Sequence, residues 1–483
     1  MPVNPSRLNI DDEHASHASA IPAPDSLHAL THLYATMALN QRSSTPPRVA
    51  VVGAGLAGLT AAWLLGEAGI PAHVFDAAAL VGGRVRSDVG SFAPGFVTEL
   101  GGEFIDTGHM DMRALAAHFG LPLIDTQAAS EEALTASYFL GGRHYSETEV
   151  VAAFGEYAPR IAEDARVADS LRDVSLAEYL DRLRVTGWLR TLLDVAYVTE
   201  FGCEAHEQPC TSFLDMIATD SSQGFAIFGS SDQRFKIEGG NVQLAQCLAH
   251  PLGERLRLGH RLVRVEPRGA ALGLHFSRDA AATFEISADI VVLALPFSLL
   301  KHVELAGVLP AHRVSAIRDL GYGSNAKIMV GLARRLWRAQ GRDGDLYSDL
   351  PGQTGWDASR LREGEAGVYT FYLGGQPGLA CGADSAAQQA LRMTAPMEAV
   401  FPGFGAPLSG KVLRAHWPGE PFSMGSYACS RVGQASTTGS AATGPVGRIY
   451  FAGEHCSDEF QGYMNGAAET GRKAALAILR SLA

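Results

Sequence analysis

The sequence predicts an α/β protein that contains more than one structural unit. Its 483 residues exceed what one hydrophobic core usually organises, and at roughly 150 residues per domain about three units are expected. Near the amino terminus, Arg48–Val52 and Ala72–Phe75 have the apolar character of buried strands and flank a helical stretch, Leu56–Glu67. A second strand-and-helix pair lies at Arg448–Phe451 and Gly462–Leu482. Strands that alternate with helices in this way are typical of an α/β fold.

The composition narrows the classes of protein to consider. Hydrophobic residues make up 47% and charged residues 19% of the chain, which is ordinary for a globular protein and argues against wholesale disorder. The 39 basic and 51 acidic residues give a net charge of −12. Nucleic acids and anionic membranes select basic surfaces, so neither is an expected partner. The acidic balance is compatible with a cationic substrate but does not demonstrate one.

The sequence predicts a cytoplasmic protein without a metal site or a membrane span. The six cysteines show no CxxC pair and no framework spacing, so they are interpreted as reduced thiols. The segment 1–41 lacks a basic stretch followed by an apolar one, which a secretory signal requires. Residues 49–66 carry no charge, but three glycines at loop-forming spacing indicate a buried strand, turn and helix rather than a span.

The remaining pattern divides into an extension and two differently patterned regions. Residues 1–47 are expected to form an amino-terminal extension with one amphipathic helix. The segment 112–248 is mostly helical in pattern, with a long apolar-periodic stretch at 176–195. Short strands are expected at Leu262–Glu266, Gly273–Phe276, Thr283–Ser287, Ile290–Leu295, Lys327–Leu332 and Gly367–Tyr372.

A glycine-rich turn after the first strand predicts a dinucleotide site. Gly53 permits the tight turn, Gly55 lets the backbone approach a pyrophosphate, and Gly58 allows the helix to lie close to the strand. Asp76, at the end of the next strand, is placed to accept hydrogen bonds from a ribose diol. Strand, helix and acid in this order favour a dinucleotide site over the alternative, a glycine-rich turn that serves packing alone.

Further motifs carry a resemblance to a known family. A Gly-Gly-Arg sequence at 82–84 follows the second strand, and it is joined by ELGGEF at 99–104, YFAGE at 450–454 and QGYMNGA at 461–467. Together these resemble the motifs of flavoproteins in the monoamine oxidase, polyamine oxidase and L-amino-acid oxidase superfamily. The resemblance covers nearly the whole chain after residue 47.

The resemblance implies a discontinuous Rossmann-type FAD-binding domain and a substrate-binding domain of mixed sheet and helices, as in monoamine oxidase. The expected FAD-binding segments are 48–103, 236–298 and 445–483, and the expected substrate-binding segments are 104–235 and 299–444. A homodimer is expected.

The resemblance also implies which residues hold the FAD. The positive end of the carboxy-terminal helix favours the negative charge that develops at the flavin pyrimidine edge. Asp76 and Ala78 depart from the family, which usually has Glu and often Arg there. Ser426 stands where some relatives attach FAD through Cys, so non-covalent FAD is predicted. The candidate cofactor-binding residues are Gly53, Gly55, Gly58, Asp76, Gly83, Arg84, Val263, Gly453, Glu454 and Met464.

Four residues are predicted to carry catalysis. By resemblance, Tyr427 and Tyr463 provide two aromatic rings that frame the substrate amine, and Trp417 matches a family tryptophan. Lys327 matches the family lysine that holds a water at flavin N5 and assists reoxidation by oxygen. The alternatives are structural aromatic residues and a solvent-facing lysine in a strand.

The activity that the resemblance implies is the FAD-dependent oxidative deamination of a small primary amine or L-amino acid. A hydride equivalent leaves the carbon that bears the amine, the imine is hydrolysed to an aldehyde or keto acid with ammonia, and oxygen, the expected acceptor, gives hydrogen peroxide. A dehydrogenase that uses a quinone or carrier, and a flavoprotein desaturase-type oxidoreductase, remain the alternatives.

The substrate is less well determined by the sequence. Phe104 stands where venom-type L-amino-acid oxidases have the arginine that binds the substrate carboxylate, so another arginine would have to replace it. An acidic cluster at 103, 106 and 111 could attract a second amino group, although a solvated acidic loop is the favoured interpretation. The candidate replacement arginines are Arg143, Arg234 and Arg431, and the acidic residues are Glu103, Asp106 and Asp111.

Overall fold

The computed structural model describes residues 46–222, 224–278, 283–305, 307–405, 408–434 and 444–482. The helix expected in the amino-terminal extension lies outside these residues. Within the described part of the chain, no helix is both long and apolar enough to cross a membrane.

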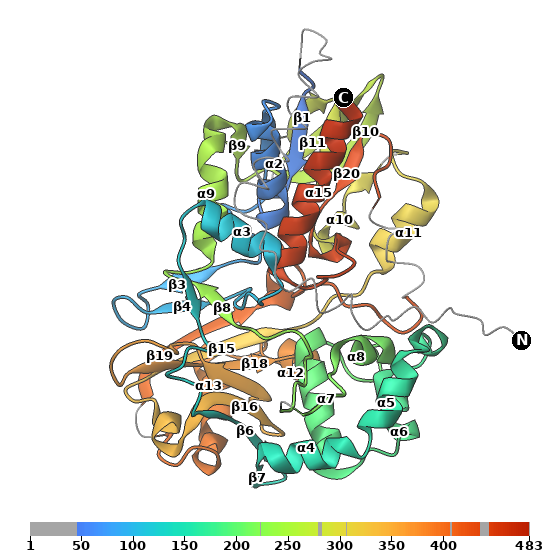
Figure 1. The fold of residues 1–483 in the computed structure, drawn as a ribbon. Helices are drawn as coiled ribbons and strands as arrows, with labels where there is room; N and C mark the ends of the chain where they lie inside the picture. The colour runs from blue at the N-terminus through green and yellow to red at the C-terminus, as the bar shows by residue number, and fades with distance from the viewer. Residues whose placement is uncertain are drawn as a thin grey trace, which may run out of the picture.

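A five-stranded parallel sheet joins strands from distant parts of the chain in the upper half of Figure 1. Its pairings are all parallel, and Val49–Val52 is aligned residue by residue with both of its neighbours. The strand order is β20 (Ile449–Phe451), β13 (Ile290–Leu293), β1 (Val49–Val52), β2 (Ala72–Phe75) and β9 (Leu256–Arg257).

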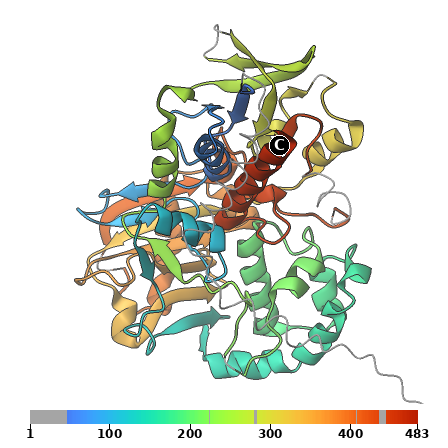
Figure 2. The same ribbon diagram turned by 45° about the horizontal axis from the view of Figure 1, so that its top comes forward.

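Two helices from opposite ends of the chain lie side by side on this sheet (Figures 1 and 2). They are α2 (Leu56–Glu67) and α15 (Met464–Leu482). A Cβ atom on Gly471 would lie 2.3 Å from the carbonyl oxygen of Ala57, so the absence of a side chain lets the two backbones approach closely. The helix that follows the first glycine-rich motif is therefore in contact with the carboxy-terminal helix, which begins within the last motif.

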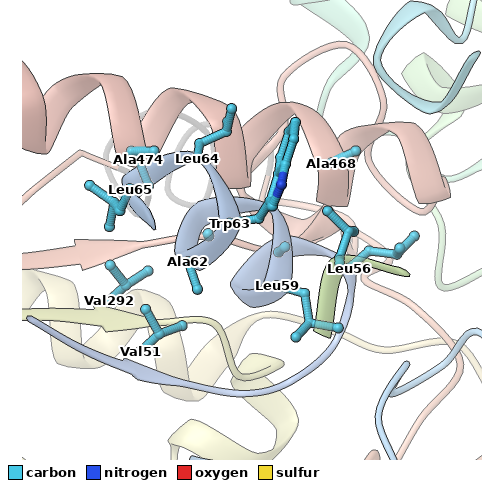
Figure 3. Packing of buried hydrophobic residues seen from close by; sticks show 14 of the residues in the cluster. Val51, Leu56, Leu59, Ala62, Trp63, Leu64, Leu65, Val292, Ala468 and Ala474 are labelled. Atoms are coloured by element: carbon cyan, nitrogen blue, oxygen red, sulfur yellow. The ribbon is translucent and has the colours of Figure 1, made fainter. Parts of the chain in front are cut away.

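The core beneath these helices is apolar and densely packed (Figure 3). Leu59 of α2, Val51 of β1 and Val292 of β13 are fully buried against one another, and Ala468 of α15 closes the cluster. Each fully buried large aliphatic side chain contributes about 1.5–3 kcal/mol relative to its exposed state. This packing fixes the turn between β1 and α2, on which the cofactor site depends. Flanking helices are α3 (Met110–His118) and α9 (Val242–Ala249).

A smaller sheet lies beside the parallel one and encloses a second core. Strands β10 to β12 pair antiparallel, and β14 adds a short parallel edge. The order is β12 (Thr283–Ala288), β11 (Ala271–Ser277), β10 (Arg261–Arg268) and β14 (Glu304–Leu305). The helix α10 (Phe297–Leu300) precedes β14 in the chain, and α11 (Ala311–Asp319) follows it.

A seven-stranded mixed sheet forms the lower left of Figure 1. Its most buried strand is β15, in which every residue is buried. The strand order is β19 (Leu408–His416), β15 (Ala326–Leu332), β18 (Gly367–Leu373), β17 (Thr354–Asp357), β16 (Arg342–Ser348), β6 (Thr135–Leu140) and β7 (Arg143–Tyr145). Two helices, α12 (Gly375–Ala380) and α13 (Ala386–Thr394), lie between β18 and β19 in the chain.

A group of helices occupies the lower right of Figure 1. The apolar stretch at 176–195 spans two helices rather than one, because Arg184 and Gly187 adopt positive φ angles of 60° and 65° between them. The helices are α4 (Glu147–Gly155), α5 (Ala158–Ala165), α6 (Leu176–Arg182), α7 (Gly187–Phe201) and α8 (Cys210–Met216).

Several strands interrupt the region whose pattern is mostly helical. Strand β6 pairs in parallel with β16, about 200 residues further along the chain, and such a partner leaves no local pattern. A short ribbon in the same region pairs β5 (Leu123–Asp125) with β8 (Phe235–Ile237), and another, β3 (Ser87–Val89) with β4 (Val97–Glu99), precedes the region in the chain.

Candidate active site

One cavity extends from the turn after β1 to the seven-stranded sheet. It encloses about 2600 Å³ of empty space, including its open mouth. Gly53 and Asp76 line one end, and Tyr347, Trp356 and Tyr372 line the other. A single ligand space therefore connects the predicted nucleotide site with a compartment of aromatic side chains.

The three glycines of the turn have different physical roles. Gly53 has a φ of +112°, and a Cβ there would lie 2.4 Å from the oxygen of Ala294. A Cβ on Gly58 would lie 1.9 Å from the oxygen of Gly53, so helix and turn touch at this point. By contrast, a Cβ on Gly55 would meet no protein atom closer than 3.9 Å. Gly55 borders the cavity, so its missing side chain leaves room for a ligand next to the backbone.

Asp76 follows β2 and faces the same end of the cavity. Its carboxylate accepts hydrogen bonds from the backbone N–H groups of Ala54, at 2.6 Å, and Ala78, at 2.7 Å. Burial raises the pKa of Asp76 above its ordinary value, against the effect of these two donors. The carboxylate thus fixes the glycine turn, and its contact with a ribose stays a prediction.

Arg84 and Glu454 link the two ends of the chain inside the cavity. Nη1 of Arg84 lies 2.7 Å from Oε1 of Glu454 and 2.8 Å from the carbonyl oxygen of Ser426. The other oxygen of Glu454 accepts a hydrogen bond from the N–H of Gly462, at 2.8 Å. Burial opposes ionisation of Glu454, but Arg84 outweighs it and holds the pKa of Glu454 below its ordinary value.

The remaining predicted cofactor residues lie at or near this cavity, except one. Gly83, Gly453 and Met464 all line it, and Met464 is the first residue of α15. Val263 does not line it; its side chain is 37% exposed. Val263 lies where the pairing of β10 with β11 shifts register, so it has no residue opposite it in that ladder. Its backbone contact with adenine stays a prediction.

The two predicted cage tyrosines converge on one residue, Glu200. The Tyr463 hydroxyl donates to Oε1 of Glu200 at 3.4 Å, and the Tyr427 hydroxyl donates to the backbone oxygen of Glu200. The Tyr427 hydroxyl also lies 2.8 Å from the hydroxyl of Tyr372. Burial and the nearby charge of Asp106 raise the pKa of Glu200 to about 7.

Local structure explains this convergence. Glu200 lies in the last turn of α7, which ends at Gly202 in a left-handed conformation. A Cβ on Gly202 would clash with the side chain of Asn325 at 2.1 Å, so this helix end lies directly against the start of β15. Tyr427 is held at the same place, since its carbonyl oxygen accepts the N–H of Gly323 at 2.9 Å.

Lys327 is buried, so the alternative of a solvent-facing lysine is wrong. Its side chain is 5% exposed, and its ammonium group donates to Oε2 of Glu103, at 2.8 Å. The carbonyl oxygens of Glu99 and Gly101 accept two further hydrogen bonds, at 3.0 and 2.8 Å. The ring of Trp356 lies 5.2 Å from the same nitrogen. Lys327 is therefore held firmly beside the aromatic compartment.

Glu103 connects this lysine with a second one. Oε1 of Glu103 accepts hydrogen bonds from Lys236, at 3.1 Å, and from the indole N–H of Trp356, at 3.0 Å. Burial opposes ionisation, yet Lys327 and Lys236 outweigh it and lower the pKa of Glu103. Trp417, also lining the cavity, donates its indole N–H to the oxygen of Leu100 at 3.1 Å.

The interpretation of residues 103–111 as a solvated acidic loop is wrong. Glu103 and Asp106 are each only 5% exposed, and Asp111 forms an ion pair with Arg472. Buried carboxylates need partners, and the distant residues that provide them could not be recognised from the local charge pattern. The candidate carboxylate-binding residues Arg143, Arg234 and Arg431 do not line the cavity, and each is paired with an acidic residue.

Sequence reasoning missed several residues of the site. No motif marks Glu200, and Tyr372, Trp356 and Lys236 lie in elements with ordinary core patterns. The one usable signal is the composition of Val198-Thr199-Glu200-Phe201, an acid placed within an apolar helix end. A buried acid at such a position is uncommon and marks a candidate site.

Fold and cavity together define a class of protein: an enzyme with a dinucleotide-type ligand turn that opens onto an aromatic, charge-lined compartment. The family model for flavin containing amine oxidoreductases matches residues 56–479. The chain therefore belongs to this family, and it is a flavin oxidoreductase that acts on C–N bonds.

The sequence identity between this chain and individual relatives is low. An L-amino-acid oxidase of Pseudechis australis is 24% identical over 462 residues, covering 90% of this chain and 87% of the relative. AofH of Mycobacterium tuberculosis, assigned as a flavin-containing monoamine oxidase, is 27% identical over 469 residues, covering 92% and 99%.

Solved structures confirm the predicted fold class. Cyclohexylamine oxidase from Brevibacterium oxydans IH-35A superposes with a TM-score of 0.79 at 20% identity, covering 91% of this chain and 100% of the other. Putrescine oxidase bound to putrescine gives a TM-score of 0.76 at 20% identity, covering 90% and 99%. At this identity the likeness concerns the fold alone.

The residues of the cavity fit a flavin dinucleotide. Gly55 leaves open space beside the backbone, and α15 directs its amino-terminal end at the cavity. Both ring nitrogens of the buried His455, which lines the same space, lack a hydrogen-bond partner among the described residues. Buried polar atoms without partners are uncommon and are explained by a ligand that bonds them. No cysteine is among the described lining residues.

Proposed function

We propose that this protein is an FAD-dependent amine oxidase that oxidises a small primary amine or L-amino acid to an imine. The observation that carries the proposal is the convergence of Tyr427, Tyr463 and Glu200 in a cavity that continues to the glycine turn. Two aromatic side chains and a carboxylate at one point suit an amine nitrogen, which is cationic before it reacts.

The residues of the chain have separate tasks in this reaction. Tyr427 and Tyr463 orient the amine, and the aromatic lining excludes water from the reacting carbon. Glu200 holds the ammonium and accepts its proton, since its pKa of about 7 lies near neutral pH. A bound FAD supplies the acceptor for the hydride equivalent. Water then hydrolyses the imine to an aldehyde or keto acid and ammonia.

We further propose that FAD is bound non-covalently and that oxygen is the acceptor, giving hydrogen peroxide. Ser426 stands at the attachment position of covalent relatives, and its hydroxyl donates to Asn325 at 2.6 Å. Lys327 supplies a buried positive charge beside the aromatic compartment, which suits reaction with oxygen. A quinone- or carrier-dependent dehydrogenase would use the same site. The homodimer and the cytoplasmic location stay predictions.

The test is the visible spectrum of the purified protein under anaerobic conditions. The expected result is a bound flavin that is released by acid denaturation and bleached by amines or L-amino acids. Admission of air then distinguishes an oxidase, which recolours within seconds, from a dehydrogenase, which recolours slowly. A bound flavin that no amine or amino acid bleaches would refute the proposal and favour the desaturase-type alternative.

A further inference from the structure

Every positive charge that lines the cavity has a carboxylate of the protein beside it, and Lys236 and Lys327 share that of Glu103. Five cationic side chains occur among the described lining residues, and each lies 2.7 to 3.1 Å from a carboxylate oxygen. A ligand carboxylate would have to compete with these contacts to bind, and separating a buried pair is costly. The five residues are Arg84, Arg86, Lys236, Lys327 and Arg360.

Glu200 is the opposite case. Among the described residues, the Tyr463 hydroxyl, at 3.4 Å, is the side-chain hydrogen-bond partner of the Glu200 carboxylate, and no lysine, arginine or histidine there forms an ion pair with it. Asp106 lies close enough to raise the pKa of Glu200 by charge repulsion. This half-buried carboxylate lacks the cation that would stabilise its ionised form.

We infer that Glu200 is the binding group for the ammonium of the substrate, and that the substrate is an amine without a carboxylate on the reacting carbon. This inference rests on the proposed function and narrows it. An alkylammonium supplies the cation that Glu200 lacks and disturbs no existing pair. An α-carboxylate would meet the repulsion of Glu200, and the ammonium of Lys327 already donates three hydrogen bonds within the protein.

The rings around Glu200 favour the same ligand. The hydroxyls of Tyr427 and Tyr463 both donate toward Glu200, and the face of a tyrosine ring attracts an alkylammonium. Tyr372 continues this aromatic wall toward Lys327, whose nitrogen lies 6.0 Å from the Tyr372 ring. Tyr372 therefore contacts the tyrosine cluster through its hydroxyl and Lys327 through its ring.

The binding test uses FAD-loaded protein and a ligand that cannot react. Trimethyl(2-phenylethyl)ammonium is permanently charged, and 2-phenylethanol is its neutral counterpart. Calorimetric titration is expected to show that Glu200→Gln weakens binding of the cation 10- to 100-fold through loss of charge attraction alone, because the trimethylammonium group has no N–H to donate. Binding of the alcohol should change less than threefold. A matched control is Asp232→Asn, because the carboxylate of Asp232 is already bonded to Thr107. Unchanged binding of the cation by Glu200→Gln would overturn the inference.

The second test compares 2-phenylethylamine with L-phenylalanine, which differ only in the carboxylate. Wild-type protein is expected to be reduced by the amine with a kcat/KM at least 100-fold above that for the amino acid. Equal values would overturn the exclusion of carboxylates. If neither compound nor any other amine bleaches the flavin, the proposed function fails, whereas the calorimetric result still decides whether Glu200 binds a cation.

A third comparison identifies which nitrogen Glu200 holds. If it holds the reacting nitrogen, Glu200→Gln weakens hexylamine and 1,6-diaminohexane alike. If it holds a second nitrogen, only the diamine is affected; both results support an ammonium site, and no effect on either contradicts it. Should the variant not fold, affinity of wild-type protein for the trimethylammonium ligand decides, since it must rise as pH increases and Glu200 ionises. A pH-independent affinity would overturn the inference.

Discussion

Glu103 and Glu200 are carboxylates that line the same cavity, but they are stabilised in different ways. Glu103 lies within hydrogen-bonding distance of two ammonium groups, those of Lys327 at 2.8 Å and Lys236 at 3.1 Å. Glu200 has a tyrosine hydroxyl and no cation of the described chain. The pKa of Glu103 is accordingly lowered, whereas burial raises that of Glu200 to about 7.

The comparison distinguishes a carboxylate whose counter-ions belong to the protein from a carboxylate whose counter-ion comes from a ligand. A carboxylate with internal counter-ions is part of the folded structure, and removing it leaves other buried charges unpaired. A carboxylate without them reduces stability in the empty protein and gains a partner only when a cation binds. Both residues are glutamates, but Glu103 is buried and Glu200 is half-buried, so partners and exposure together decide the role.

The largest effect is expected for Glu103→Ala. It leaves the ammonium groups of Lys236 and Lys327 buried without their shared counter-ion, which costs about 3–5 kcal/mol of unfolding free energy. Denaturant unfolding followed by tryptophan fluorescence measures the loss. Glu363→Ala, at an exposed loop position, serves as control and should change stability by less than about 0.5 kcal/mol. Equal stability of the two variants would show that the lysines do not depend on Glu103.

Glu200→Gln is expected to act on stability with the opposite sign. The folded-state pKa of Glu200 is raised from 4.5 to about 7, so the folded protein binds this proton more tightly than the unfolded chain. Below pH 4.5 the Glu200 carboxyl is protonated in both states and does not reduce the free energy of unfolding. As pH rises to about 7, its ionisation lowers that free energy. Without amine, the glutamine variant should therefore be more stable at pH 8, by up to about 3 kcal/mol, and similar to wild type at pH 4.

Denaturant unfolding of wild type and Glu200→Gln at pH 4 and pH 8 checks this prediction. A variant that is less stable than wild type at pH 8 would mean that Glu200 has an internal partner, and the distinction from Glu103 would disappear. Saturating amine should reverse the order at pH 8, because only wild-type protein then gains the ion pair.

Asp106→Asn tests the cause of the raised pKa. Asp106 is the charged neighbour that, after burial, raises the pKa of Glu200. Without this charge Glu200 ionises at lower pH, so the midpoint of the pH dependence of trimethyl(2-phenylethyl)ammonium binding should move down from about 7, by roughly half to one unit. Calorimetry across pH 5–9 measures it. Asp458→Asn, at an exposed position, should leave the midpoint in place. An upward shift would contradict the assigned cause.

Local sequence patterns predicted the fold class and the glycine turn that borders the cavity. The spacing of Gly53, Gly55 and Gly58 requires only neighbouring backbone, and strands such as β15 and β18 are apolar runs that the chain reveals directly. The fold class is confirmed by solved structures. The roles of the individual predicted site residues stay predictions.

The charge pattern of the substrate end could not be predicted from the sequence. Glu103 is separated from Lys236 by 133 residues and from Lys327 by 224, so its neutralisation depends on tertiary contacts. Glu200 belongs to no motif, and its exposure to the cavity follows from where α7 ends against β15. An acidic residue in an apolar helix end was the only local signal.

Lys236→Met gives the smallest expected effect and sharpens the description of Glu103. The variant removes one of two counter-ions and the hydrogen bond to Ala358, while Lys327 still pairs with Glu103. One remaining ammonium neutralises one carboxylate, so the loss should be about 1–2 kcal/mol, well below that of Glu103→Ala. Denaturant unfolding measures it beside Lys301→Met, which lies at an exposed position. A loss as large as that of Glu103→Ala would show that Lys236, rather than Lys327, is the cation on which Glu103 depends.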